Sequence, residues 1–329
     1  MIIIINMNKL IIYLVVIFTL FMTACSTPTY NTQEAEENIS ELSQPLILTT
    51  FYPVEEITKA IVQNTAEVKV VVGTGVEPHS FEPSPTQIVE LSKADVFVIM
   101  KGMFEHIEEE ILNTNPNIKI IDSSLDLELI NGNEGEDDEY EEESQDSEDE
   151  FEEHDLAHGE SDPHVWLSIH NMEAMTNEIF EQLIEIYPEN KELYETNAQA
   201  YLDKLEELEK EFATKLSNCE HNKIIVNHKA FGYLAHEYGF EQIGIAGFSP
   251  ESEPSPKTIQ NVVDEAKKHK FKYIFSEGQL DKKTAQTIAN DIGGEILELN
   301  PIKLNENENY FSIMRANLNN IVKGLDCQN

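Results

Sequence analysis

Basic residues are scarce in this chain. Of its 329 residues, 22 are Lys or Arg and 62 are Asp or Glu, so the formal charge is −40, and Arg315 is the single arginine. Nucleic-acid binding requires clustered basic side chains. The composition therefore argues against a nucleic-acid partner, whereas the negative charge suits a cation as ligand.

Cysteine is also rare, with three residues at Cys25, Cys219 and Cys327. No CxxC pair occurs, which excludes a zinc ribbon and a thioredoxin-type redox site. In an exported protein Cys219 and Cys327 could form a disulfide. Their spacing leaves a disulfide and two free thiols equally open.

Catalytic signatures are missing as well. The sequence has no GxSxG and no P-loop, and the stretch HEYGF that begins at His236 is not the HExxH of a zinc protease. A catalytic zinc also needs an open position for water. The sequence therefore disfavours a zinc hydrolase, and we expect no enzymatic reaction.

The N-terminus has the layout of a secretory signal peptide. Lys9 precedes an apolar run over residues 10–22, and small residues follow before Cys25. This pattern predicts a signal peptide over residues 1–24 and lipidation at Cys25, with an uncleaved membrane anchor as the alternative. Residues 25–45 are polar and predict a flexible tether. We expect a protein anchored by lipid at the extracellular face of the membrane.

Short β-branched runs predict the strands. They are continuous rather than alternating, which is typical of strands buried on both faces of a parallel sheet. Helical patterns lie between several of them, as in βαβ units. The runs fall in two sets of four, at residues 46–51, 68–72, 95–100 and 118–122, and at residues 223–227, 243–248, 272–276 and 295–299.

One long helix is predicted between the two sets. Apolar residues recur every three or four positions over residues 190–217, on one face of a helix. The stripe consists of Tyr194, Ala198, Tyr201, Leu205, Leu208, Phe212 and Leu216. The sequence thus predicts an α/β fold with two lobes, each a roughly four-stranded parallel sheet with flanking helices. The N-terminal lobe covers residues 46–187, the rigid linker helix 188–217 and the C-terminal lobe 218–329.

An acidic loop over residues 131–162 interrupts the first lobe. Its segment 134–153 holds 14 acidic residues of 20, so it cannot fold through burial. His154 and His158 follow that segment. Two interpretations stay open: a solubilising linker, or a loop that collects cations weakly.

Four side chains with metal-ligand chemistry occupy matching places. His79, His228 and Glu277 each follow a predicted strand, at the edge where open α/β sheets bind ligands. His164 lies in the stretch SDPHVWLSIH, beside the only tryptophan, Trp166, which we expect to shield the site from water. Three imidazoles and one carboxylate suit a tetrahedral zinc ion. The histidines outside this set and outside the acidic loop are interpreted as structural: His106, His170, His221, His236 and His269.

These motifs together resemble those of the solute-binding lipoproteins of zinc and manganese ABC transporters, the cluster A-I family. The resemblance covers residues 46–329 and rests on GVEPHSFEPSP, SDPHVWLS, VNHKAFGYLAHEYG, GFSPESEPSP and IFSEGQLDKKTAQTIA. It implies two lobes joined by a long helix, with the metal between them. His79, His164 and His228 match the family's three histidine ligands, and Glu277 matches the fourth ligand of zinc-binding relatives from Gram-positive bacteria.

One position departs from the family. Asn300 stands where many relatives carry an aspartate, which leaves Glu277, or a water molecule, as the fourth ligand. Glu77 is a weaker candidate that we interpret as shaping its loop. Manganese-binding members use two carboxylates and two histidines, so this donor set favours Zn²⁺ over Mn²⁺.

The resemblance implies a monomer that captures extracellular zinc and delivers it to an ABC-transporter permease. The alternatives are a manganese-binding protein of the same family and a metal-dependent adhesin.

Overall fold

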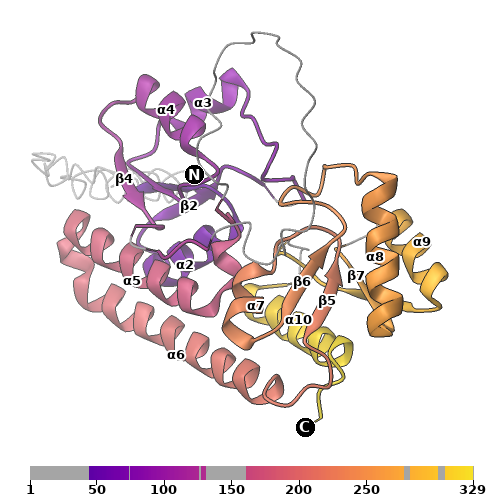
Figure 1. The fold of residues 1–329 in the computed structure, drawn as a ribbon. Helices are drawn as coiled ribbons and strands as arrows, with labels where there is room; N and C mark the ends of the chain where they lie inside the picture. Colours follow the sequence, from indigo (N-terminus) through magenta and orange to yellow (C-terminus); the bar gives the residue numbers. More distant parts are fainter. Residues whose placement is uncertain are drawn as a thin grey trace, which may run out of the picture. The chain divides into compact units, whose positions relative to one another are not determined.

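Parallel strands form the framework of both halves of the computed structural model (Figure 1). The structure describes residues 44–73, 75–125, 127–130, 161–277, 282–302 and 308–328. The predicted signal peptide, Cys25, most of the tether, and His154 and His158 of the acidic loop lie outside these residues. Within the described part, no helix has the length and apolar character needed to cross a membrane.

The first half contains a four-stranded sheet in the order β2-β1-β3-β4, with every neighbouring pair parallel. Three helices connect its strands in turn, α2, α3 and α4. Strand β3 is fully buried, as its continuous apolar run predicts. The bounds are β1 Leu46–Thr49, α2 Tyr52–Val62, β2 Glu67–Val70, α3 Pro85–Leu91, β3 Val96–Ile99, α4 Glu105–Thr114 and β4 Lys119–Asp122.

The second half contains the other four predicted strands. They are hydrogen-bonded as two parallel pairs, β5 with β6 and β7 with β8, and β5 also packs beside β7. Strand β6 begins two residues before its predicted run. The bounds are β5 Lys223–Val226, α7 Gly232–Tyr238, β6 Glu241–Gly244, α8 Pro256–His269, β7 Tyr273–Ser276, α9 Lys282–Ile292 and β8 Glu295–Glu298. The predicted fold class is confirmed, with the second set of strands divided into two pairs.

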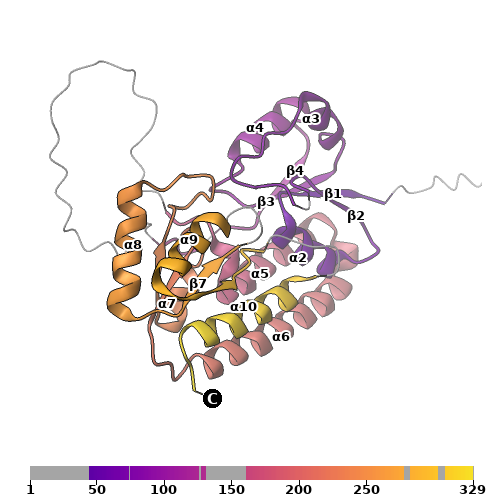
Figure 2. The same ribbon diagram turned by 90° about the vertical axis from the view of Figure 1, so that its right-hand side faces the viewer.

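Long helices join the halves. After the 3-10 turn η1 (Val165–Leu167), α5 spans Ile169–Ile186, a second 3-10 turn η2 spans Pro188–Asn190, and α6 spans Lys191–Lys215. Helix α6 confirms that one long helix lies between the two sets of strands, and its predicted apolar stripe is buried. It contacts α2 and α5 from the first half and the last helix, α10 (Tyr310–Gly324), from the second (Figure 2).

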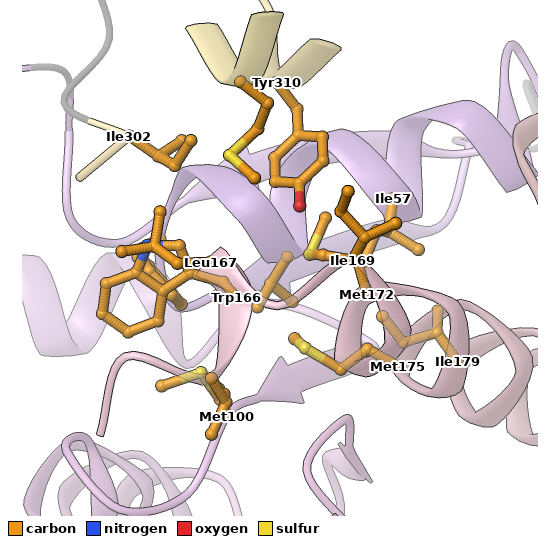
Figure 3. Packing of buried hydrophobic residues seen from close by; sticks show 14 of the residues in the cluster. Ile57, Met100, Trp166, Leu167, Ile169, Met172, Met175, Ile179, Ile302 and Tyr310 are labelled. Carbon is orange, nitrogen blue, oxygen red and sulfur yellow. The ribbon is translucent and has the colours of Figure 1, made fainter. Parts of the chain in front are cut away.

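One hydrophobic core runs through both halves. It includes Ile57 of α2, Met172 of α5 and Tyr310 of α10, together with Trp166 (Figure 3). A smaller cluster is confined to the second half, between residues 225 and 289. Because the larger core is shared, the segments that carry the site are held by the same packing.

Cys219 and Cys327 form a disulfide, which resolves the question that their spacing left open. Cys219 follows α6, and Cys327 follows α10. The disulfide therefore links the segment after α10 to the segment between α6 and β5.

We expect the double variant Cys219→Ser/Cys327→Ser to lose about 3 kcal/mol of unfolding free energy. The disulfide links residues 108 positions apart, and a cross-link over such a loop restricts the unfolded chain strongly. Urea unfolding measures the effect, and the reduced wild-type protein should match the variant. An unchanged unfolding midpoint would show that the bond contributes no stability.

Candidate metal site

His79 lies on the loop between β2 and α3. That loop begins where β2 ends at the sheet edge and finishes at Ser84, whose hydroxyl accepts a hydrogen bond from the backbone of Gln87 to cap α3. The backbone N–H of His79 donates to Glu77 Oε1 at 3.4 Å, consistent with a loop-shaping role for Glu77. His79 itself is half-buried, so this ligand candidate is the one closest to solvent.

His164 is fully buried at the start of η1. Asp162, two residues earlier, holds it twice: Asp162 Oδ1 accepts from the backbone N–H of His164 at 2.9 Å and lies 2.7 Å from its Nδ1. Tyr233 of α7 donates to the backbone oxygen of Asp162 at 2.9 Å. The segment that carries His164 is thus anchored to the second half of the protein.

His228 is buried just past β5, as predicted. Its Nδ1 lies in hydrogen-bonding contact with Glu277 Oε1, and its backbone N–H donates to the same oxygen at 3.3 Å. Glu277 follows β7, the strand beside β5, so both side chains emerge at the same sheet edge.

The three imidazoles converge through their Nε2 atoms. His164 Nε2 lies 3.1 Å from His79 Nε2 and 3.2 Å from His228 Nε2. The three ligand nitrogens all lie within 4.8 Å of one another. With zinc–nitrogen bonds near 2.0–2.1 Å, two ligands at tetrahedral angles are separated by about 3.3 Å. The two separations from His164 Nε2 fit that geometry.

The carboxylates of Asp162 and Glu277 orient two of these imidazoles so that Nε2 can bind a cation. An ionised carboxylate only accepts hydrogen bonds, so Nδ1 of His164 and of His228 carries the proton when its carboxylate partner is ionised. In the neutral rings each Nε2 then presents a lone pair, and two lone pairs 3.2 Å apart cannot hydrogen-bond to each other. A metal ion between them satisfies both, as in the carboxylate–histidine–metal arrangement common in proteins.

Asp162 was not among the sequence-predicted site residues. Burial raises the pKa of its carboxyl group to about 7, against the opposite effects of the His164 backbone N–H and the neighbouring imidazoles. A divalent cation nearby favours the ionised form of such a group. The signal that could have identified it is the spacing in Asp162-Pro163-His164, which lets the carboxylate reach back to the ring.

Glu277 does not join the nitrogen cluster. The described residues whose ligand atoms converge are the three histidines, and Glu277 contacts the far side of the His228 ring. In this geometry Glu277 contacts Nδ1 and the backbone N–H of His228, as Asp162 contacts those of His164. Its assignment as fourth ligand stays a prediction.

A pocket opens in front of the histidines. Its lining is largely apolar, with Glu55 and Glu77 as the carboxylates among the described lining residues. Trp166 lines it and is 2% exposed, in the place expected of a shield. Pro301 and Ile302 line it as well, whereas Asn300 does not. The three histidines therefore form part of the wall of this pocket.

The remaining described histidines lie outside the cluster. His170 is 60% exposed and pairs with Glu237 at 3.4 Å. His106 contacts a backbone oxygen at residue 81, and His269 pairs with Glu265. His221 and His236 are likewise not among the residues that converge.

Two parallel-stranded halves, a long joining helix and a convergent histidine cluster define a two-lobed solute-binding protein with a metal site. The chain belongs to a known family of this class: residues 47–324 match the family model described as zinc-uptake complex component A, periplasmic.

Named relatives agree with that assignment. The chain is 34% identical over 320 residues to the zinc-binding lipoprotein AdcA of Streptococcus pneumoniae, covering 95% of this chain and 60% of the relative. It is 35% identical over 283 residues to the high-affinity zinc uptake system protein ZnuA of Bacillus subtilis, covering 83% and 85%. The chain thus spans a little over half the length of the AdcA proteins it matches.

Solved structures are similar as well. The Zn(II)-bound ZnuA-like domain of S. pneumoniae AdcA has a TM-score of 0.70 at 33% identity, covering 86% of this chain and 99% of that domain. The laminin-binding protein Lmb of Streptococcus agalactiae, described as having adhesin and metal-transporting activity, has a TM-score of 0.72 at 27% identity, covering 85% and 99%.

Proposed function

We propose that the protein captures zinc with His79, His164 and His228 and delivers it to an ABC-transporter permease. The observation that carries this proposal is the convergence of the three imidazoles, in which the separations of His164 Nε2 from the other two Nε2 atoms fit a tetrahedral zinc ion. Imidazole donors favour zinc over manganese, which prefers oxygen ligands. The zinc-related names of AdcA and ZnuA support the same cargo.

The proposal includes the place of the protein and its division into parts. Lipid attached at Cys25 would hold it at the extracellular face of the membrane, where residues 25–45, if they act as the expected tether, would let the binding unit reach the permease. We propose the lobes at residues 46–187 and 218–329, with residues 188–217 as the linker helix, and a monomeric protein. No chemical reaction is part of this function.

Cells that lack the gene should take up less zinc and grow poorly when zinc is limiting. The wild-type gene should restore uptake, whereas His228→Ala, expressed at the same level, should not, because it removes one of three nitrogen donors. Radiolabelled zinc uptake measures the effect. Uptake restored equally by both genes would contradict the proposed function.

Glu277 has two roles to separate, fourth ligand and partner of His228. Asp162→Asn is the matched control, because Asp162 contacts His164 at Nδ1 and at the backbone N–H, as Glu277 contacts His228. Loss of such a partner lowers metal affinity roughly 10- to 100-fold. If Glu277 is a ligand, Glu277→Gln should lose clearly more zinc affinity than Asp162→Asn, measured by competition with a chelator. Equal losses would assign Glu277 to holding His228 and leave the fourth position to water.

A further inference from the structure

Trp166 is fixed from two sides. The ring of Phe51 packs edge-on against the indole, with ring centroids 4.8 Å apart. On another side the indole Nε1–H donates to the backbone oxygen of Pro301 at 3.0 Å. Phe51 follows β1 and Pro301 follows β8, so the indole connects the two halves of the protein beside the metal pocket.

The loop that supplies the Pro301 oxygen is itself anchored. Asn317 of α10 is 2% exposed. Its side-chain amide forms two hydrogen bonds with the backbone of Asn300. Its Oδ1 accepts from the Asn300 N–H at 2.8 Å, and its Nδ2 donates to the Asn300 oxygen at 2.7 Å. A buried amide that satisfies both backbone groups of Asn300 holds the chain at the residue that leads into Pro301.

Ile302 adds an unusual backbone conformation at the same place. Its φ is +72°, a left-handed value that β-branched residues rarely adopt. Such conformations persist only where the surroundings impose them, and they cluster at functional sites. Ile302 is buried, lines the metal pocket together with Trp166, and lies in the same region of the core (Figure 3).

The indole of Trp166, held in this way, lies next to the imidazole ring of His164. The two residues are two positions apart at η1, and their ring centroids lie 5.2 Å apart. Asp162 fixes the Nδ1 side of the imidazole. The indole limits how the ring can tilt, which sets where Nε2 points.

We propose that Asn317, the Pro301 carbonyl and Trp166 form a positioning chain that runs from α10 to His164 and slows zinc release. Trp166 and Asn317 are thus positioning residues that do not touch the metal, and the conformation of Ile302 keeps the Pro301 carbonyl aimed at the indole. This inference rests on the proposed zinc-binding function.

The test compares zinc release from four proteins into excess chelator by stopped flow. Trp166→Phe keeps an aromatic ring but removes the N–H donor. Ile302→Gly frees the strained backbone, and Lys270→Gly makes the same change at another left-handed residue, φ +57°, at the end of α8. We expect release about tenfold faster for the first two variants and within twofold of wild type for Lys270→Gly.

Two further readouts separate positioning from general stability. The visible spectrum of the Co²⁺-loaded proteins reports ligand geometry and should change in Trp166→Phe and Ile302→Gly but not in Lys270→Gly. In Ile302→Gly, fluorescence of the single tryptophan should also shift to longer wavelength as the indole loosens; this variant carries the test if Trp166→Phe does not fold. Wild-type release rates and Co²⁺ spectra in both variants would overturn the inference alone, whereas a wild-type protein that binds no zinc would overturn the proposed function as well.

Discussion

Alanine at His164 should weaken zinc binding roughly 60- to 700-fold. A four-ligand zinc site in a protein is worth about 10–16 kcal/mol in total, so one donor contributes about 2.5–4 kcal/mol, and each 1.4 kcal/mol is a factor of ten. His79→Ala and His228→Ala should show losses of the same order. Chelator competition at constant pH measures the affinities.

The control for these variants is His269→Ala. His269 pairs with Glu265 and stacks on Phe271, outside the converging cluster, so its loss should leave the affinity unchanged. Thermal unfolding should show that the ligand variants remain folded, because the shared core does not depend on the imidazoles. Wild-type zinc affinity in two of the three ligand variants would contradict the assignment of these histidines as zinc ligands.

Zinc affinity should also fall steeply in acid, by as much as about a thousandfold per pH unit well below pH 6. An imidazole binds metal through a neutral nitrogen, and histidine side chains ordinarily titrate near pH 6.5. Three histidine ligands therefore release up to about three protons on binding when they start protonated. Isothermal titration at several pH values, with buffers of different ionisation enthalpy, counts those protons.

Asp162 should add a shallower dependence near neutrality. Burial raises the pKa of this carboxyl group to about 7 in the metal-free protein. As the pH falls through 7 the group takes up a proton, whereas bound zinc favours its ionised form, so affinity should begin to drop there. Asp162→Asn should lose this neutral component and keep the steep acid component. A wild-type affinity that stays flat from pH 8 to pH 5 would contradict ligation by histidine.

The sequence was sufficient to predict elements whose burial pattern is local. Continuous apolar runs located the strands within a few residues, and the stripe from Tyr194 to Leu216 located α6. The pairing of β5 to β8 into two pairs was not predictable, because hydrogen bonding between strands depends on packing across the whole sheet. The same holds for the disulfide, which depends on the distance between two residues 108 positions apart.

Some residues of the candidate site were likewise predictable from the sequence, and others were not. Histidines that follow strand ends were identifiable because parallel strands place their carboxyl ends at one edge. The structure brings His79, His164 and His228 together. The contacts of carboxylates with the Nδ1 atoms of His164 and His228 were not predictable. A carboxylate can bind the metal or hydrogen-bond to a histidine ligand, and the amino-acid sequence does not distinguish these two roles. Asp162 and the contact of Glu277 with His228 therefore emerged only from the geometry.

Metal analysis after competition between Zn²⁺ and Mn²⁺ tests whether the three histidines form a zinc site. The purified, metal-stripped protein is mixed with equal, saturating amounts of Zn²⁺ and Mn²⁺, separated from free ions, and its metal content is measured by mass spectrometry. We expect one zinc per chain with little manganese, and less than a tenth of that zinc in the triple variant His79→Ala/His164→Ala/His228→Ala. Bound manganese in excess of zinc, or equal zinc in both proteins, would contradict it.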